Sequence, residues 1–88
     1  MDYNYPLRHD WSTDEMIAVT EFYTVIEKAY EEGARRNDIL TAYENFKKIV
    51  PSKAEEKTLF REFEKASGYK SYPIVRAASA GNEELIKG

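Results

Sequence analysis

The apolar residues of this chain recur at steps of three and four positions, which is the spacing of one face of an α-helix. The first stripe is continuous and consists of Met16, Val19, Phe22, Tyr23, Ile26, Ala29 and Tyr30. Ser12 and Glu15 precede it at the spacing of a capping box, in which each side chain bonds the backbone amide of the other. Gly33 follows it, as glycine often follows the end of a helix. The pattern predicts a helix over residues 13–32.

A second stripe of apolar residues comes before Pro51. Because the residue before a proline disfavours helical geometry, the helix should stop there. Asn37 or Asp38 is the predicted N-cap, since short polar side chains bond the free amides of a first turn. The sequence therefore predicts a second helix over residues 38–50.

Two shorter stripes complete the helical pattern. Ser52 again stands three residues before a glutamate, which predicts a second capping box and a helix over residues 53–67. Ser71 is the predicted cap of a fourth helix, over residues 72–80, and Pro73 suits its first turn.

The segments outside these stripes lack helical spacing. Residues 1–11 are aromatic and irregular, and we expect this arm to lie against the helices; residues 82–88 are expected to fray. No run of four or more residues alternates as a strand does. The sequence predicts an all-α fold, a compact antiparallel bundle of four helices in one domain spanning residues 1–88.

The composition narrows the class of protein. The chain has 88 residues, of which 42% are hydrophobic and 33% charged, and it has no cysteine for disulfides or thiolate sites. No stretch approaches the ~20 apolar residues of a membrane span, and the N-terminus lacks the features of a signal peptide. We therefore expect a cytoplasmic protein with no membrane partner.

The charged residues give little support to nucleic-acid binding. The net charge is −3, whereas a phosphate backbone attracts an excess of Lys and Arg. Lys53, Lys57 and Arg61 stand four apart and form a basic edge on the third predicted helix. Glutamates alternate with them, so a mixed, solvated face is the preferred interpretation and weak nucleic-acid binding remains a second alternative.

Candidate catalytic and metal-binding groups are sparse. His9 lies near Asp10 and Asp14, but one imidazole in an irregular arm does not supply the three protein ligands of a zinc site. We assign no catalytic residue, metal or cofactor. A small-ligand site or an enzyme centre near Tyr5, His9 and Asp10 remains the first alternative.

Aromatic residues are abundant: seven Tyr, four Phe and one Trp. Small domains use aromatic side chains to raise the area that each residue buries. For most aromatic residues of this chain, burial in the core is the preferred explanation. The other aromatic residues lie in the N-terminal arm and at the corner between the third and fourth predicted helices, residues 69–72. If these two segments lie side by side, they form a surface suited to protein contact. Those residues are Tyr3, Tyr5, Trp11, Tyr69 and Tyr72.

Two blocks of sequence carry a resemblance to a known family. The first comprises Tyr5-Pro6-Leu7, Asp10-Trp11-Ser12-Thr13 and Glu15-Met16-Ile17. The second comprises Pro51-Ser52-Lys53-Ala54-Glu55-Glu56-Lys57, Phe60-Arg61-Glu62-Phe63-Glu64, Ser67-Gly68-Tyr69 and Ser71-Tyr72. Together they resemble the uncharacterised YktA-like proteins of low-GC Gram-positive bacteria. The resemblance implies a small helical cytoplasmic protein, and it implies no activity, catalytic residue or cofactor.

These observations favour a non-enzymatic helical module that binds protein, either an unidentified partner or a second copy of itself. The predicted contact residues are the five aromatic ones of the N-terminal arm and of the corner between the third and fourth predicted helices, with a basic rim. In full they are Tyr3, Tyr5, Trp11, Tyr69 and Tyr72, with Lys53, Lys57 and Arg61.

Overall fold

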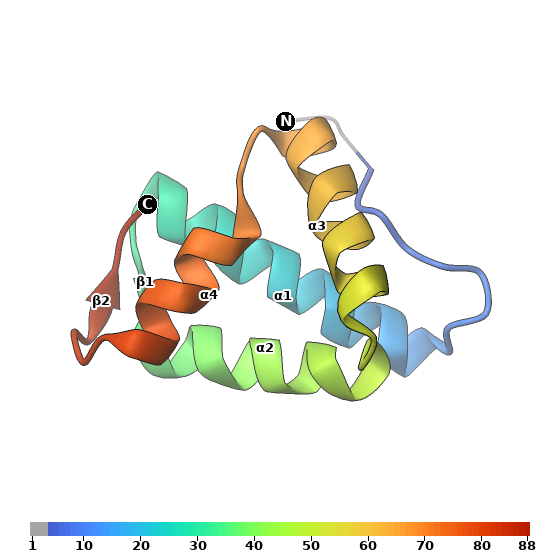
Figure 1. Cartoon of the computed structure of the whole chain (residues 1–88), viewed down its shortest axis with the longest axis horizontal. Helices are drawn as coiled ribbons and strands as arrows, with labels where there is room; N and C mark the ends of the chain where they lie inside the picture. Colours follow the sequence, from blue (N-terminus) through green and yellow to red (C-terminus); the bar gives the residue numbers. More distant parts are fainter. Residues whose placement is uncertain (1–3) are drawn as a thin grey trace.

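Four helices make up most of residues 4–88, which confirms the all-α prediction (Figure 1). The computed structural model describes residues 4–88, so the predicted contact residue Tyr3 lies outside the described residues. The elements are α1 (Thr13–Glu31), β1 (Ala34–Arg35), α2 (Arg36–Ile49), α3 (Lys53–Ser67), α4 (Ser71–Ala80) and β2 (Leu85–Ile86).

The start and end of α1 follow the signals in the sequence. The Ser12 Oγ accepts from the Glu15 amide at 3.1 Å, and the Glu15 carboxylate accepts from the Ser12 amide at 2.8 Å. Beyond the helix, Gly33 has a φ of 95°, which residues with a side chain rarely adopt. The predicted capping box and glycine terminator are both confirmed.

The helices form a hairpin with two further helices set against it (Figure 1). α2 runs back along α1 in the opposite direction, and the chain then turns a sharp corner at Pro51. α3 rises steeply from that corner, and α4 returns to lie over α2. α4 therefore contacts all three of the other helices.

The core of the molecule is an aromatic cluster. Phe22, Tyr23, Phe46 and Phe63 have no exposed side-chain or backbone area. Phe22 stacks on Phe46 with ring centroids 4.7 Å apart, and Tyr23 stacks on Phe63 at 4.6 Å. Such pairs stabilise beyond the area they bury, by about 0.5–1.5 kcal/mol each. The cluster joins α1, α2 and α3.

α2 begins earlier than predicted, and its predicted cap is wrong. It starts at Arg36, and the N-cap residue, Arg35, provides no side-chain bond. The Arg36 amide instead donates to the Glu84 carbonyl oxygen at 2.7 Å. A backbone acceptor from the far end of the chain thus replaces the cap expected from Asn37 or Asp38.

The prediction that residues 82–88 fray is also wrong. β2 pairs with β1 in an antiparallel two-stranded sheet, with Ala34 opposite Ile86. Ile86 is 6% exposed, and the Gly88 amide donates to the Ala29 carbonyl oxygen at 3.0 Å. Strands of two residues are too short to show alternation in a sequence, so only the structure reveals them.

The later helices agree more closely with prediction. α3 has the predicted bounds, and Gly68 ends it with a φ of 84°. The Ser52 Oγ accepts from the Glu55 amide at 3.3 Å, but the Glu55 carboxylate lies 4.0 Å from the Arg8 guanidinium, so only half of the predicted box is seen. Ser71 is the first residue of α4 rather than its cap.

A candidate binding groove between α2, α3 and α4

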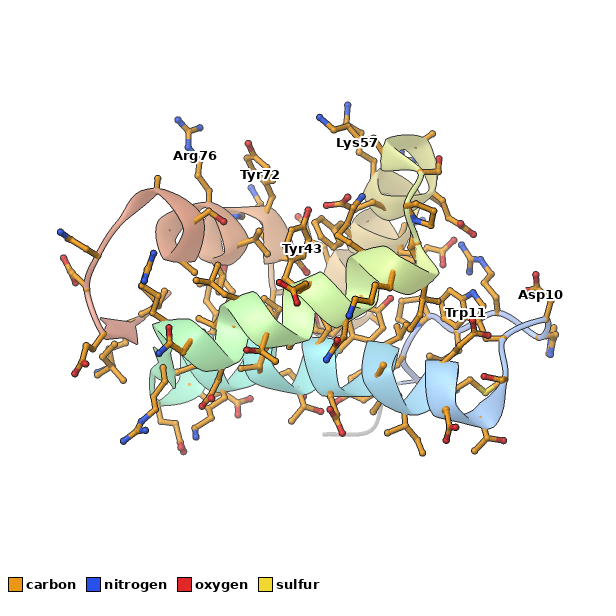
Figure 2. The ribbon with its side chains drawn as sticks, turned by 90° about the horizontal axis from the view of Figure 1, so that it is seen from below. Asp10, Trp11, Tyr43, Lys57, Tyr72 and Arg76 are labelled. Atoms are coloured by element: carbon orange, nitrogen blue, oxygen red, sulfur yellow. The ribbon has the colours of Figure 1, made fainter. Side chains whose placement is uncertain are left out.

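A groove of about 770 Å³ opens where α2, α3 and α4 meet. We call it the α2–α3–α4 groove. Its apolar lining consists of Tyr43, Phe60, Tyr72 and Pro73. Figure 2 shows Tyr43 rising from α2 between Lys57 on α3 and Tyr72 on α4. The groove therefore presents an aromatic floor with side chains from three helices around it.

Positive charge dominates the rim of the groove. Lys53, Lys57 and Arg61 are exposed along α3, and Lys70 is exposed just before α4. Among residues 4–88, none of these four cations forms an ion pair. Exposed, unpaired cations of this kind attract anionic groups on a ligand.

A buried carboxylate lies in the floor. Glu56 is 8% exposed, and it accepts a hydrogen bond from the Tyr43 hydroxyl at 2.8 Å and one from the Lys47 ammonium at 2.5 Å. Burial raises the pKa of Tyr43, and the hydrogen bond to Glu56 raises it further, so the phenol remains a neutral donor. This cluster ties α2 to α3 beneath the groove.

At the end of the groove formed by α4, one buried polar group lacks a hydrogen-bond partner among the described residues. Ser71 is 1% exposed, and its Oγ has no hydrogen-bond partner within the described part of the chain. Lys70, at the N-cap, offers no side-chain bond to the first turn of α4. Buried polar atoms are nearly always hydrogen-bonded, so an unbonded hydroxyl in the wall of a groove calls for an explanation.

Tyr72 is the most exposed large hydrophobic side chain among the described residues, at 60%. Figure 2 shows it projecting from the outer side of α4, next to Arg76. Its neighbours Ser71 and Pro73 also line the groove, so the ring stands at the groove's edge. Tyr is one of the residue types enriched among those that dominate the binding energy of protein interfaces.

Two further predicted contact residues, Tyr5 and Tyr69, lie elsewhere, along the edge of α1. The Tyr5 hydroxyl donates to Glu27 at 2.5 Å, and the Tyr69 hydroxyl donates to Glu31 at 2.9 Å. Tyr69 also stacks on Tyr30, with centroids 4.9 Å apart. Since Glu27 and Glu31 are one helical turn apart, Tyr5 and Tyr69 come to neighbouring positions, as the sequence hypothesis required of the two segments.

The α1 edge and the α2–α3–α4 groove are thus separate surfaces. Tyr72 and the three predicted cations belong to the groove, and Tyr5 and Tyr69 belong to the α1 edge. Trp11 is only partly buried and packs against the core. The predicted contact residues that the structure describes are therefore divided between these places rather than gathered in one patch.

The carboxylates of the α1 edge are electrostatically coupled. Partial burial raises the pKa of Glu27, and the neighbouring charge of Glu31 raises it further. The hydrogen bond to Glu31 raises the pKa of Tyr69. Both shifts favour the neutral forms of these groups.

The structure does not bring together Tyr5, His9 and Asp10, the residues of the alternative ligand or enzyme site. Tyr5 turns toward the core, with its ring 5.3 Å from that of Tyr23. His9 and Asp10 are exposed in the turn before α1, and Figure 2 shows Asp10 directed away from the body of the molecule. No group of three His, Asp or Glu side chains in residues 4–88 is placed to hold a metal ion.

Sequence reasoning missed several residues of the groove, among them Tyr43, Lys70 and Ser71. The solvated face expected for the glutamates of the third predicted helix is wrong for Glu56, although the sequence contains a signal of its burial. Glu56 lies one turn before Leu59 and Phe60, on the apolar stripe of α3, where a glutamate is partly buried if it has partners. The partners come from α2, and the sequence gives no indication of that contact.

None of the helices in the described region is both long enough and apolar enough to cross a lipid bilayer.

The fold and the groove define a class: a small helical protein, with four helices in residues 4–88 and an aromatic groove rimmed by cations. A family model described as "Uncharacterised protein family (UPF0223)" matches residues 2–87, and the chain belongs to this family. Relatives span nearly the same length. A UPF0223 protein of Lysinibacillus sphaericus is 55% identical over 88 residues, covering 99% of this chain and 93% of the relative.

Two further relatives show the same pattern. A UPF0223 protein of Oceanobacillus iheyensis is 52% identical and covers 99% of both chains. One from Staphylococcus aureus is 50% identical, covering 96% of this chain and 92% of the relative. These low-GC Gram-positive genera agree with the resemblance seen in the sequence, while the narrower YktA-like name stays a prediction. The family has no assigned function.

Proposed function

We propose that this protein is a small helical module that binds a segment of another protein in the α2–α3–α4 groove. The observation that carries the proposal is the combination of an aromatic floor with four exposed cations that have no ion-pair partner among residues 4–88. Aromatic side chains supply apolar contact, and unpaired cations supply direction and specificity.

The state of Glu56 supports binding rather than chemistry at this groove. A general acid or base must be free to exchange a proton with a substrate. Both hydrogen bonds that Glu56 accepts hold it in the floor of the groove, where it fixes Tyr43 and Lys47 in place. A groove with a rigid floor and a charged rim suits recognition. The cytoplasmic location expected from the sequence is part of the same proposal.

A photo-reactive amino acid at position 72 tests the proposal in living cells of a host bacterium. The matched control carries it at Thr24, an exposed residue of α1. We expect Tyr72 variants to give a discrete protein adduct after irradiation, identified by mass spectrometry, and Thr24 variants to lack it.

The same adduct should disappear when Lys57 and Arg61 are changed to alanine in the Tyr72 cross-linking variant, because the rim then loses two of its cations. Equal adducts from positions 72 and 24, or no adduct from position 72, would contradict the proposal.

A further inference from the structure

We infer that the occupant of the groove is an amphipathic α-helix of a separate partner protein, whose acidic side chains face the cations of α3. The inference rests on the proposed function and names the chemistry of the partner. Its central observation is the spacing of Lys53, Lys57 and Arg61, which lie along one edge of α3 and line the same groove.

The spacing of these cations sets the spacing of their partners. Residues four apart on an α-helix are about 6 Å apart along its axis, so the three cations span about 12 Å. A second helix lying beside α3 places acidic residues in register when they too are four apart. The partner is therefore expected to carry Asp or Glu at positions i, i+4 and i+8 of one face.

The walls of the groove favour a helix over an extended peptide. Extended peptides gain much of their affinity by adding a strand to the edge of a sheet. All three walls here are helices, whose backbone groups are bonded internally, and the short β1–β2 sheet does not line the groove. A helix instead offers apolar residues at i, i+3 and i+4 to Tyr43, Phe60 and Tyr72.

The charges of the groove favour a protein helix over a nucleic acid. Two carboxylates, Glu56 and Glu64, lie among its lining residues, and the chain has a net charge of −3. A nucleic-acid backbone presents phosphates at every step and repels such carboxylates. An amphipathic helix meets the cations with one edge and the aromatic floor with its apolar face.

A second copy of this chain is a poor occupant, although α1 carries many acidic residues. Figure 2 shows α1 on the opposite side of the molecule from Lys57 and Tyr72. An α1 docked in the groove of another copy would leave its own groove open to the next copy. Such head-to-tail contacts build rings or open filaments rather than a closed pair, so a separate partner fits the arrangement better.

Three fluorescent peptides of about five helical turns test the inference by titration with the intact protein. The register peptide has Glu at i, i+4 and i+8 beside a Leu face, the shuffled peptide distributes the same residues around the helix, and the neutral peptide replaces Glu with Gln. We expect the register peptide to bind about tenfold more tightly than either of the others.

Variants of the protein test whether the peptide binds at the cations of α3. Lys57→Ala and Arg61→Ala should each weaken binding of the register peptide severalfold and leave the shuffled peptide unaffected. Lys48→Ala and Lys65→Ala are matched controls, because both side chains are exposed and lie outside the groove lining. Binding that responds equally to all four substitutions would overturn the inference.

The remaining outcomes separate this inference from the proposed function. Equal affinity for the register and neutral peptides would overturn the acidic partner. Competition by a DNA oligonucleotide at low salt would show that the groove binds nucleic acid instead of a partner helix. Self-association that Lys57→Ala abolishes would show that it binds a second copy of the chain. If no peptide binds but the Tyr72 adduct forms in cells, the inference fails and the proposed function stands. If neither is seen, both fail.

Discussion

The aromatic core and the α2–α3–α4 groove are built from the same kinds of residue and differ in what covers them. Phe22 and Phe46 are fully enclosed, whereas Tyr72 is 60% exposed. Phe60 belongs to both regions, since it stacks on Phe22 with centroids 5.7 Å apart and also lines the groove. The abundance of aromatic residues therefore has two explanations, which apply to different parts of the molecule.

Polar groups show the same difference between the two regions. In the core, the Tyr23 hydroxyl donates to the Pro6 carbonyl oxygen at 3.1 Å, so the N-terminal arm satisfies it. At the groove, Ser71 Oγ and four cations have no such partner among the described residues. Polar groups that are bonded within the chain stabilise the fold, whereas the exposed cations of the rim are available to a ligand.

Phe22→Ala and Tyr72→Ala should separate the regions most strongly. Removing the enclosed ring leaves a cavity among Tyr43, Phe46 and Phe60, and the free energy of unfolding should fall by about 3–5 kcal/mol. Removing the exposed ring should change it by less than about 0.5 kcal/mol. Urea denaturation measures both, and similar losses from the two changes would refute the division.

Glu56→Ala should destabilise the protein by about 2 kcal/mol, because the Tyr43 hydroxyl and the Lys47 ammonium lose a buried acceptor. Glu64→Ala, at an exposed position of the same groove, is the control and should stay within about 0.5 kcal/mol of the parent. Thermal and urea unfolding report both. If Glu56→Ala were as mild as its control, the floor of the groove would not be the rigid element described.

Ser71→Ala should stabilise the free protein by about 1 kcal/mol, because it removes a buried hydroxyl that lacks a partner and places a better helix former in α4. Ser79→Ala changes an exposed serine of the same helix and isolates the contribution of helix propensity. A loss of stability in Ser71→Ala would show that the hydroxyl is bonded in solution.

The α1 edge offers a smaller effect that depends on pH. The pKa of Glu27 lies above its ordinary value of 4.5, so the unfolded chain releases this proton at lower pH than the folded one does. Stability is therefore lost as pH rises from about 4.5 through the folded pKa. Glu27→Gln should gain stability relative to the parent between about pH 4 and pH 7.

Glu21→Gln, at an exposed position of α1, is the control for Glu27→Gln. Denaturation curves at several pH values measure the difference. A Glu27→Gln advantage that did not change with pH would show that the burial of this carboxylate has no effect on the fold.

The sequence predicted the helices well where their signals were local. Each of these signals acts within one turn of the helix end that it marks, so the predicted bounds of α1 and α3 lie close to the observed ones. The signals are Ser12 with Glu15, Gly33, Pro51 and Gly68. The start of α2 was wrong because its first amide bonds the Glu84 carbonyl, nearly fifty residues away in the chain. Local patterns carry no information about such an acceptor.

The candidate site was predicted in part for the same reason. The basic edge of α3 follows from four-residue spacing, and it does line the groove. The angle between α3 and α4 places Tyr72 beside this basic edge and Tyr69 next to Glu31 on α1. The sequence does not give that angle. The burial of Glu56 depends on contacts from α2. The positions of the helices relative to one another are determined by packing, and the spacing of apolar residues does not predict them.

A charge exchange tests most directly that the groove receives an acidic helix. Lys57→Glu is combined with a register peptide in which Lys replaces the Glu expected to face position 57, and dissociation constants are measured for all four pairings. Each change alone should weaken binding about tenfold, and the two together should restore it, because the ion pair is re-formed with its signs reversed. Affinity that is indifferent to Lys57→Glu, or that is not regained in the exchanged pair, would contradict the account.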